Sequence, residues 1–191
     1  MYSTKNNINQ QLKIWLLLIL SLIILLILVG GLTRLTDSGL SITKWELFAG
    51  FLPPFTNDKW IDYFNLYKAI PEYTEQNFNM ILSEFKVIFW WEWAHRQPGR
   101  LIGLTVLLPL IYFSIIEGSW IIKKYGIIFV LVCLQGFFGW YMVSSGLIDR
   151  VDVSHYRLSI HLVTAFIILS IVFWNFLKLT SIQVNKISIK L

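Results

Sequence analysis

The stretch WEWAHRQPGRLIGLTVLLPLIYFSII, residues 91–116, joins a charged segment to a long apolar run. A carboxylate, an imidazole and two guanidiniums stand at its start, and they come from Glu92, His95, Arg96 and Arg100. The run that follows, if it is continued back to Trp93, is long enough for a helix that crosses a membrane. We therefore predict a transmembrane helix over 93–116 that carries ionisable groups in its first turns.

Three further uncharged runs approach the roughly 20 apolar residues that a membrane-spanning helix needs. They are residues 14–32, 125–148 and 158–177. The chain is 56% hydrophobic and only 14% charged, whereas about a quarter of the residues of a soluble protein are charged. A signal peptide is the rival interpretation of 14–32, but its apolar stretch is too long and no small-residue cleavage site follows. The sequence predicts an all-α membrane protein in which residues 1–191 form a single domain, a four-helix transmembrane bundle.

Residues 33–91 contain prolines, many aromatic residues and charges of both signs. We expect them to form a long external loop with short helices between the first and second spans. The basic residues at the two termini and in the short loop between the second and third spans outnumber the acidic ones there. Because the positive-inside rule counts such short segments, the termini are expected to be cytoplasmic and the protein to be a multi-pass protein of the inner membrane. The basic residues on that side are Lys5, Lys13, Lys123, Lys124, Lys178, Lys186 and Lys190.

The net charge of +5 does not indicate a nucleic-acid partner, because no basic run is long enough to follow a phosphate backbone. Membrane lipid headgroups are the expected partners of the lysines at the helix ends. The single cysteine, Cys133, excludes an intrachain disulfide. It lies in an apolar run, and we expect it to be a small buried hydrophobic residue.

His95 and His161 stand near the starts of the second and fourth predicted spans, which run in the same direction. The two side chains therefore fall at a similar depth and can face each other. Two histidines on facing helices of a bundle are a common way to hold a haem. A lone histidine would more often be a hydrogen-bonded structural residue, but ionisable groups within spans are costly and usually functional. The pair favours iron ligation, whereas His155 lies in a loop and is expected to be solvated.

Glu92 precedes His95 by three positions, so a helix places both side chains on one face. The carboxylate is therefore a candidate catalytic group beside whatever His95 binds. An interfacial glutamate that pairs with Arg96 or Arg100 explains the residue equally well.

Three arginines stand close to the two histidines: Arg96 and Arg100 follow His95, and Arg157 precedes His161. A guanidinium matches a carboxylate bidentately, so all three are candidates for binding haem propionates. Contact with lipid headgroups is an equally good explanation of their positions.

Four stretches resemble, in order and spacing, the motifs of the haem A synthase family in its proteobacterial and mitochondrial branch. They are VGGLTRLTDSGLSITKW (29–45), EFKVIFWWEWAHRQPGRLIG (84–103), GWYMVSSGL (139–147) and YRLSIHL (156–162). Members of that family have eight spans in two four-helix halves, each with a histidine pair, and this chain resembles the amino-terminal half. The family is an oxidoreductase that converts the C8 methyl of haem O to a formyl group by successive hydroxylations, which gives haem A for terminal oxidases.

The resemblance implies that His95 and His161 flank the substrate haem O and that Glu92 is the carboxylate on the reactive side. It also implies that the haem b cofactor belongs to a carboxyl-terminal half that this sequence does not include. We expect this chain alone to be inactive. The expected partners are haem O, a carboxyl-terminal half or a second copy of the chain, and haem O synthase. Some branches of the family carry a cysteine pair in the first external loop, and this loop has none.

Without the family resemblance, the residues predict only a membrane bundle that binds haem. Two other functions are therefore considered. A cytochrome b-like electron carrier would hold a permanent haem on both histidines, but it has no need of a carboxylate one turn from a ligand. A membrane anchor or assembly subunit would bind no haem and would show no Soret band.

Overall fold

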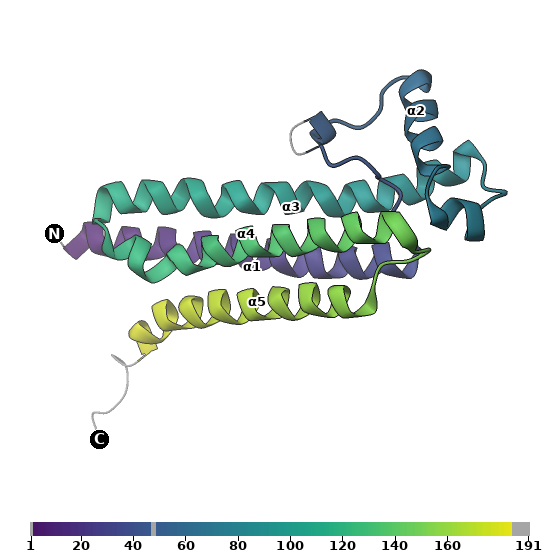
Figure 1. Ribbon diagram of the computed structural model, residues 1–191. Helices are drawn as coiled ribbons and strands as arrows, with labels where there is room; N and C mark the ends of the chain where they lie inside the picture. The colour runs from purple at the N-terminus through teal and green to yellow at the C-terminus, as the bar shows by residue number, and fades with distance from the viewer. Residues whose placement is uncertain (1, 47–48, 185–191) are drawn as a thin grey trace.

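The computed structural model describes residues 2–46 and 49–184, and four long helices lie side by side in it (Figure 1). Helix α1 packs against α3 and α5, and α4 packs against the same two helices, so the four form a bundle. All four are long and apolar enough to cross a membrane. The prediction of an all-α, four-span membrane protein is confirmed. The helices are α1 (Tyr2–Leu35), α3 (Leu82–Glu117), α4 (Trp120–Asp149) and α5 (His155–Val184).

The helices are longer than the apolar runs from which their positions were predicted. Helix α3 begins at Leu82 rather than near Trp93, and α1 continues to Leu35. The predicted loop of residues 33–91 is therefore too long at both ends. The first turns of α3 are helical although they carry charges, because Phe85 and Phe89 bury one face of this stretch against the neighbouring loop segment.

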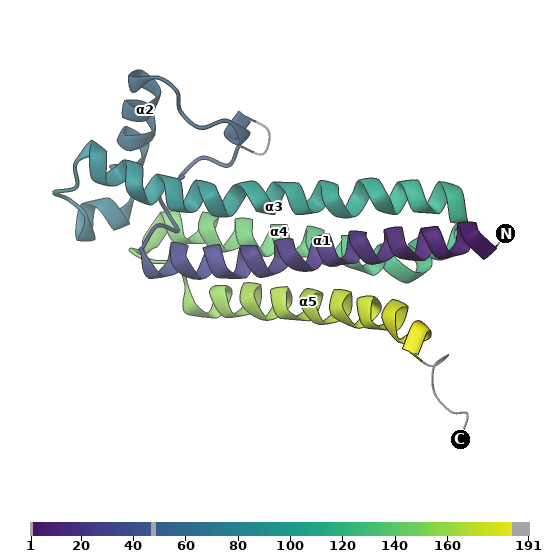
Figure 2. The same ribbon diagram turned by 180° about the vertical axis from the view of Figure 1, so that it is seen from behind.

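The described part of the segment between α1 and α3 contains three short helices: η1 (Ala49–Phe51), α2 (Asn57–Tyr67) and the π-helix η2 (Glu72–Gln76). Thr56 caps α2, since its hydroxyl accepts a hydrogen bond from the Lys59 backbone N–H. The buried face of α2 packs on the start of α3 through an aromatic cluster that consists of Trp60, Phe64, Tyr67, Phe85 and Phe89. This cluster fixes the segment at one end of the bundle, where α2 is seen in both views (Figure 2).

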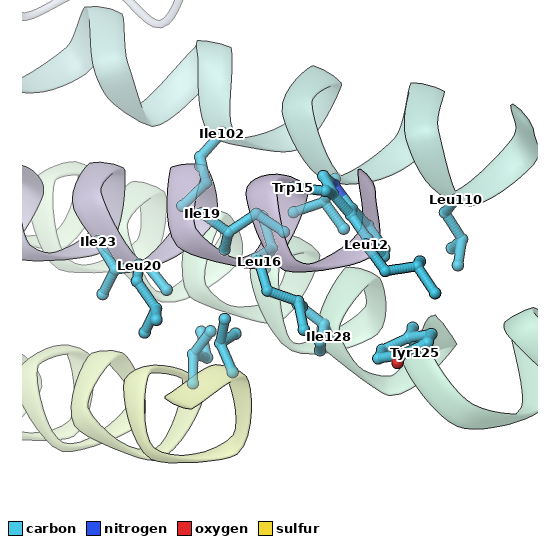
Figure 3. Packing of buried hydrophobic residues seen from close by; sticks show 14 of the residues in the cluster. Leu12, Trp15, Leu16, Ile19, Leu20, Ile23, Ile102, Leu110, Tyr125 and Ile128 are labelled. Atoms are coloured by element: carbon cyan, nitrogen blue, oxygen red, sulfur yellow. The ribbon is translucent and has the colours of Figure 1, made fainter. Parts of the chain in front are cut away.

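The main core lies in the other part of the bundle (Figure 3). Leu12, Leu16 and Ile19 of α1 are fully buried, and Ile102 of α3 and Ile128 of α4 pack against the same cluster. In lipid, such close packing stabilises helix association by dispersion rather than by removal of apolar surface from water. The outer faces of the helices carry many exposed leucines, isoleucines and valines, as expected of surfaces that face lipid.

Cys133 lies on such an outer face of α4 and is exposed. The prediction that it is buried is wrong. An apolar run cannot show which of its residues face lipid and which face the bundle, because both environments accept the same side chains.

Helices α3 and α5 both start at the end of the bundle that carries α2, and α1 starts and α5 ends at the opposite end (Figures 1 and 2). The second and fourth spans therefore run in the same direction, as the sequence predicted. This places the beginnings of α3 and α5, which carry the two candidate ligands, at the same end of the bundle.

Candidate functional site

His95 of α3 and His161 of α5 lie in the same layer of the bundle. In α3, His95 stands between Phe89 of the aromatic cluster and Ile102 of the main core. His161 stands before Ile168, the first α5 residue buried in the main core. His95 lies seven positions before Ile102, and His161 lies seven positions before Ile168. The matched depth predicted from sequence is therefore present in the structure.

The Nδ1 atoms of His95 and His161 are both buried, and neither has a hydrogen-bond partner among residues 2–46 and 49–184. A buried polar atom without a partner is costly and needs an explanation. Ligation of a metal through Nδ1 would supply one, whereas ligation through Nε2 would leave Nδ1 in need of a separate hydrogen-bond partner.

Each histidine ring packs against a glycine of a neighbouring helix. A Cβ atom added to Gly30 of α1 would lie 2.9 Å from Cε1 of His95, and one added to Gly139 of α4 would lie 3.1 Å from Cε1 of His161. Real Cβ atoms almost never approach another atom as closely as the first of these distances. The two rings thus occupy space that the side chain of any residue other than glycine would fill at positions 30 and 139. In the sequence both glycines stand in the motifs of residues 29–45 and 139–147, which do not indicate contact with a histidine.

Gln135 of α4 joins its helix to α5 beside the second histidine. Its Nε2 atom donates to the backbone carbonyl of His161 over 2.9 Å, while its Oε1 atom is buried and has no partner in the described part of the chain. This residue was not predicted, because nothing in an apolar run indicates which neighbour a glutamine will reach.

The Glu92 carboxylate is buried, with 3% of the residue exposed, and both of its oxygens accept hydrogen bonds. Oε2 accepts from the Ser41 hydroxyl and from the Ile42 backbone N–H, each over 2.7 Å. Oε1 forms an ion pair with Arg96. The pairing of Glu92 with Arg96 that the sequence left open is thus present, and Ser41 and Ile42 are partners that sequence reasoning missed.

The three candidate arginines make different contacts. Arg96 holds Glu92 and also donates from Nη2 to the Ile42 carbonyl over 2.9 Å. Arg100 donates to the Glu46 carbonyl over 3.0 Å. Arg157 lies apart from these two, with its guanidinium 4.9 Å from the centre of the Tyr141 ring.

A small pocket lies beside Arg96 and Arg100, and its other walls include Glu46, Tyr63 and Trp93. The Tyr63 hydroxyl donates to Glu46 over 2.9 Å. Burial, with the adjacent Glu46 carboxylate, raises the pKa of Tyr63 to about 12, so this hydroxyl keeps its proton at neutral pH. The indole N–H of Trp93 is buried and has no hydrogen-bond partner among the described residues. The pocket therefore places the donors of Arg96 and Arg100 beside the Glu46 side chain.

A second buried carboxyl group, that of Glu72 in η2, was not predicted. It lines a pocket with Thr33, Arg34, Asp37 and Asp152, and its Oε2 atom has no hydrogen-bond partner in the described chain. Burial raises the pKa of Glu72 to about 8, with a smaller contribution from the negative charge of Glu92. Glu72 is therefore mainly protonated at neutral pH.

Iron in a haem is the metal that suits this donor set. Over residues 2–46 and 49–184 no group of three or more histidine, cysteine or acidic side chains could hold a metal ion. A haem needs only two protein ligands, because the porphyrin supplies the rest of the coordination sphere. Two partly buried imidazoles on parallel helices fit that requirement.

Fold and site define a class of protein: a four-helix membrane bundle with two histidines at one depth on parallel helices and a buried glutamate one turn from one of them. Residues 13–189 match the COX15-CtaA family, described as cytochrome oxidase assembly protein, and the chain belongs to this family. The chain is 55% identical to the heme A synthase of Pelagibacter ubique over 96% of its own length and 55% of that protein. The identity is 47% to the heme A synthase of Rhodopseudomonas palustris, over 95% of the chain and 51% of the relative.

The heme A synthase of Rickettsia bellii is 49% identical over 89% of this chain and 51% of its own length. The chain thus spans about half the length of the curated relatives that it matches. No solved structure matches it significantly. The resemblance read from the four motifs is confirmed at the level of the family.

Proposed function

We propose that this chain is the amino-terminal, substrate-binding half of a haem A synthase. In this proposal, haem O lies between His95 and His161, and its C8 methyl is oxidised to a formyl group to give haem A. One observation carries the proposal: two partly buried imidazoles on parallel helices lie at one depth, each with a buried Nδ1 that has no partner among the described residues and each packed against a glycine. About 50% identity to proteins named heme A synthase supports the same conclusion.

The chain's own residues have separate roles in this proposal. His95 and His161 hold the iron of the substrate, and water supplies the formyl oxygen as four electrons and four protons leave the methyl group and this water. Glu92 supplies a fixed negative charge, or a proton acceptor, beside His95, where positive charge develops as the methyl group is oxidised. Arg96, Arg100 and Arg157 are the proposed partners of the propionates, and Arg96 also donates to Glu92 and to the Ile42 carbonyl.

Electrons removed from the methyl group must leave the site, and the family resemblance places the haem b that receives them in a carboxyl-terminal half. We propose that this half is supplied by a further segment or a separate chain, with self-association as the alternative. Haem O synthase is the proposed donor of the substrate. The proposed location is the inner membrane, with the termini in the cytoplasm and the α2 end of the bundle outside.

The cytochrome b-like electron carrier is not favoured. It would explain the histidine pair, but the relatives at about half identity are named for a synthase. A buried glutamate held by three donors beside a ligand has no obvious use in simple electron transfer.

The test is to express residues 1–191 in cells that make haem O, with and without a separately encoded carboxyl-terminal half taken from a close relative, and to extract the haems. We expect haem O bound to the short chain alone and haem A only when both halves are present. Haem A in cells with the short chain alone would show that one bundle suffices. No haem in either preparation would overturn the proposed function.

A further inference from the structure

The connection that leaves α1 returns to the site and contacts Glu92 directly. Ser41 and Ile42 lie about fifty positions before Glu92 in the chain, yet both donate to the same carboxylate oxygen over 2.7 Å. Ser41 is 1% exposed and Ile42 is 8% exposed, so water does not compete for these donors. The proposed function assigns no role to this connection.

The two oxygens of Glu92 are held from different sides. Oε1 is bound by Arg96, which lies one turn further along the same helix, whereas among the described residues Oε2 is bound only by the connection from α1. A carboxylate bound by Arg96 alone could still rotate about its last side-chain bond. The contacts to Oε2 are therefore the ones that fix its orientation.

Ser41 has one hydroxyl proton and two acceptors within reach. Its oxygen lies 2.7 Å from Glu92 Oε2 and 3.3 Å from the Ile88 carbonyl. A hydrogen bond to a charged acceptor is shorter and stronger than one to a neutral carbonyl, so the Ser41 hydroxyl donates to the Glu92 carboxylate. The Ile88 carbonyl lies inside α3, where it accepts a hydrogen bond of the helix itself, so it is satisfied without the Ser41 hydroxyl.

The connection that carries Ser41 is itself held rigidly. At its start, the Thr36 and Ser38 hydroxyls lie 2.7 Å apart, and the Ser38 backbone N–H donates to the Thr33 carbonyl over 3.0 Å. In its middle, Leu40 packs so closely against α4 that a Cβ on Gly146 would lie 2.9 Å from its Cδ2. The donors are therefore placed before any substrate binds.

We propose that Ser41 is a positioning residue for methyl oxidation, which together with the Ile42 backbone N–H fixes the orientation of the Glu92 carboxylate toward the substrate. This inference rests on the proposed function, because it concerns the use of Glu92 in turnover. Since Ser41 contacts Glu92 and neither histidine, its loss should affect turnover and spare haem binding. A carboxylate that has lost one of its two donors on Oε2 no longer presents its charge in one direction.

The experiment compares Ser41→Ala with Ser21→Ala in residues 1–191 expressed with the carboxyl-terminal half. Ser21 is an exposed serine of α1 whose hydroxyl bonds only to the Leu17 carbonyl of its own helix, so it controls for loss of a hydroxyl as such. Three quantities are measured: haem content with its absorption spectrum, the yield of haem A, and the infrared carboxylate stretch of Glu92. That band is identified by its loss in Glu92→Gln.

For Ser41→Ala we expect unchanged haem content and spectrum, a shifted Glu92 band, and haem A yield about 10- to 100-fold lower, as expected for loss of a hydrogen bond to a charged group. Ser21→Ala should match the parent in all three. Parental haem A yield, an unshifted Glu92 band, or a loss of haem A that only follows a loss of bound haem would each overturn the inference. If the parent pair itself makes no haem A, the proposed function fails instead, and the infrared band still reports whether Ser41 binds Glu92.

Discussion

Replacing Gly30 with alanine adds a single methyl group at the contact between α1 and His95. The new Cβ would lie 2.9 Å from Cε1 of His95. An ordinary contact between carbon atoms is about 3.5–4.0 Å, so either the ring or the helix must move by more than half an ångström. A shift of that size is large compared with the roughly 0.2 Å tolerance of a metal–ligand bond.

The magnitude follows from two opposing terms. Overpacking a well-filled site costs about 1–3 kcal/mol, whereas alanine is better than glycine in a helix by up to about 1 kcal/mol. The stability of helix α1 therefore changes little, while the steric clash displaces the His95 ring and any group that it ligates. If 1–3 kcal/mol of strain is felt in the bound state, haem affinity falls by about 5- to 150-fold.

Gly31 provides a matched control one position away. A Cβ added there meets nothing within 4 Å, so Gly31→Ala gains the helix preference of alanine without any clash. The assay is titration of the purified chain with haem O in detergent, followed by the Soret band. We expect weaker binding or a perturbed low-spin spectrum for Gly30→Ala and parental behaviour for Gly31→Ala. Equal affinities and spectra for the two variants would refute the placement of His95 against α1.

Three further predictions follow from other contacts. Gly139→Ala, whose Cβ would lie 3.1 Å from His161 Cε1, should weaken haem binding while Gly136→Ala does not; equal Soret titrations would contradict this. Glu92→Gln should keep bound haem but lose haem A formation, measured by haem extraction from cells with both halves; parental yield would reduce Glu92 to a structural partner. The folded state holds the Glu72 proton up to about pH 8, whereas the unfolded chain releases it near pH 4.5, so the free energy of unfolding should fall by up to about 4 kcal/mol from pH 4.5 to 8. In thermal melts over this pH range, Glu72→Gln should flatten that fall. An unchanged slope would exclude Glu72 as its source.

The helices and the histidine pair could be predicted because they depend on local pattern. Apolar runs identified all four spanning helices, and the direction of α3 and α5 placed His95 and His161 at one depth. The start of α3 could not be predicted, since the stretch before Trp93 carries charges. It is helical because Phe85 and Phe89 have partners on α2, which lies some twenty residues or more away in the chain.

The contacts that complete the site were not predictable from pattern, because each joins segments far apart in sequence. Ser41 stands in a motif that indicates no role for it, and only the structure shows that its hydroxyl donates to Glu92. Gly30 was one of several glycines in an apolar helix until His95 was found against it. Glu72 was one of several acidic residues in a polar loop, and only the fold shows that it is buried.

The assignment of His95 and His161 as the two axial ligands is tested most directly by the low-spin absorption spectrum of residues 1–191 purified with haem O. We expect the six-coordinate low-spin spectrum in the parent chain and in His155→Ala, because His155 is exposed at the start of α5. The spectrum should be lost in both His95→Ala and His161→Ala. A low-spin spectrum that survives in either of these two variants would remove that histidine from the site and contradict the account.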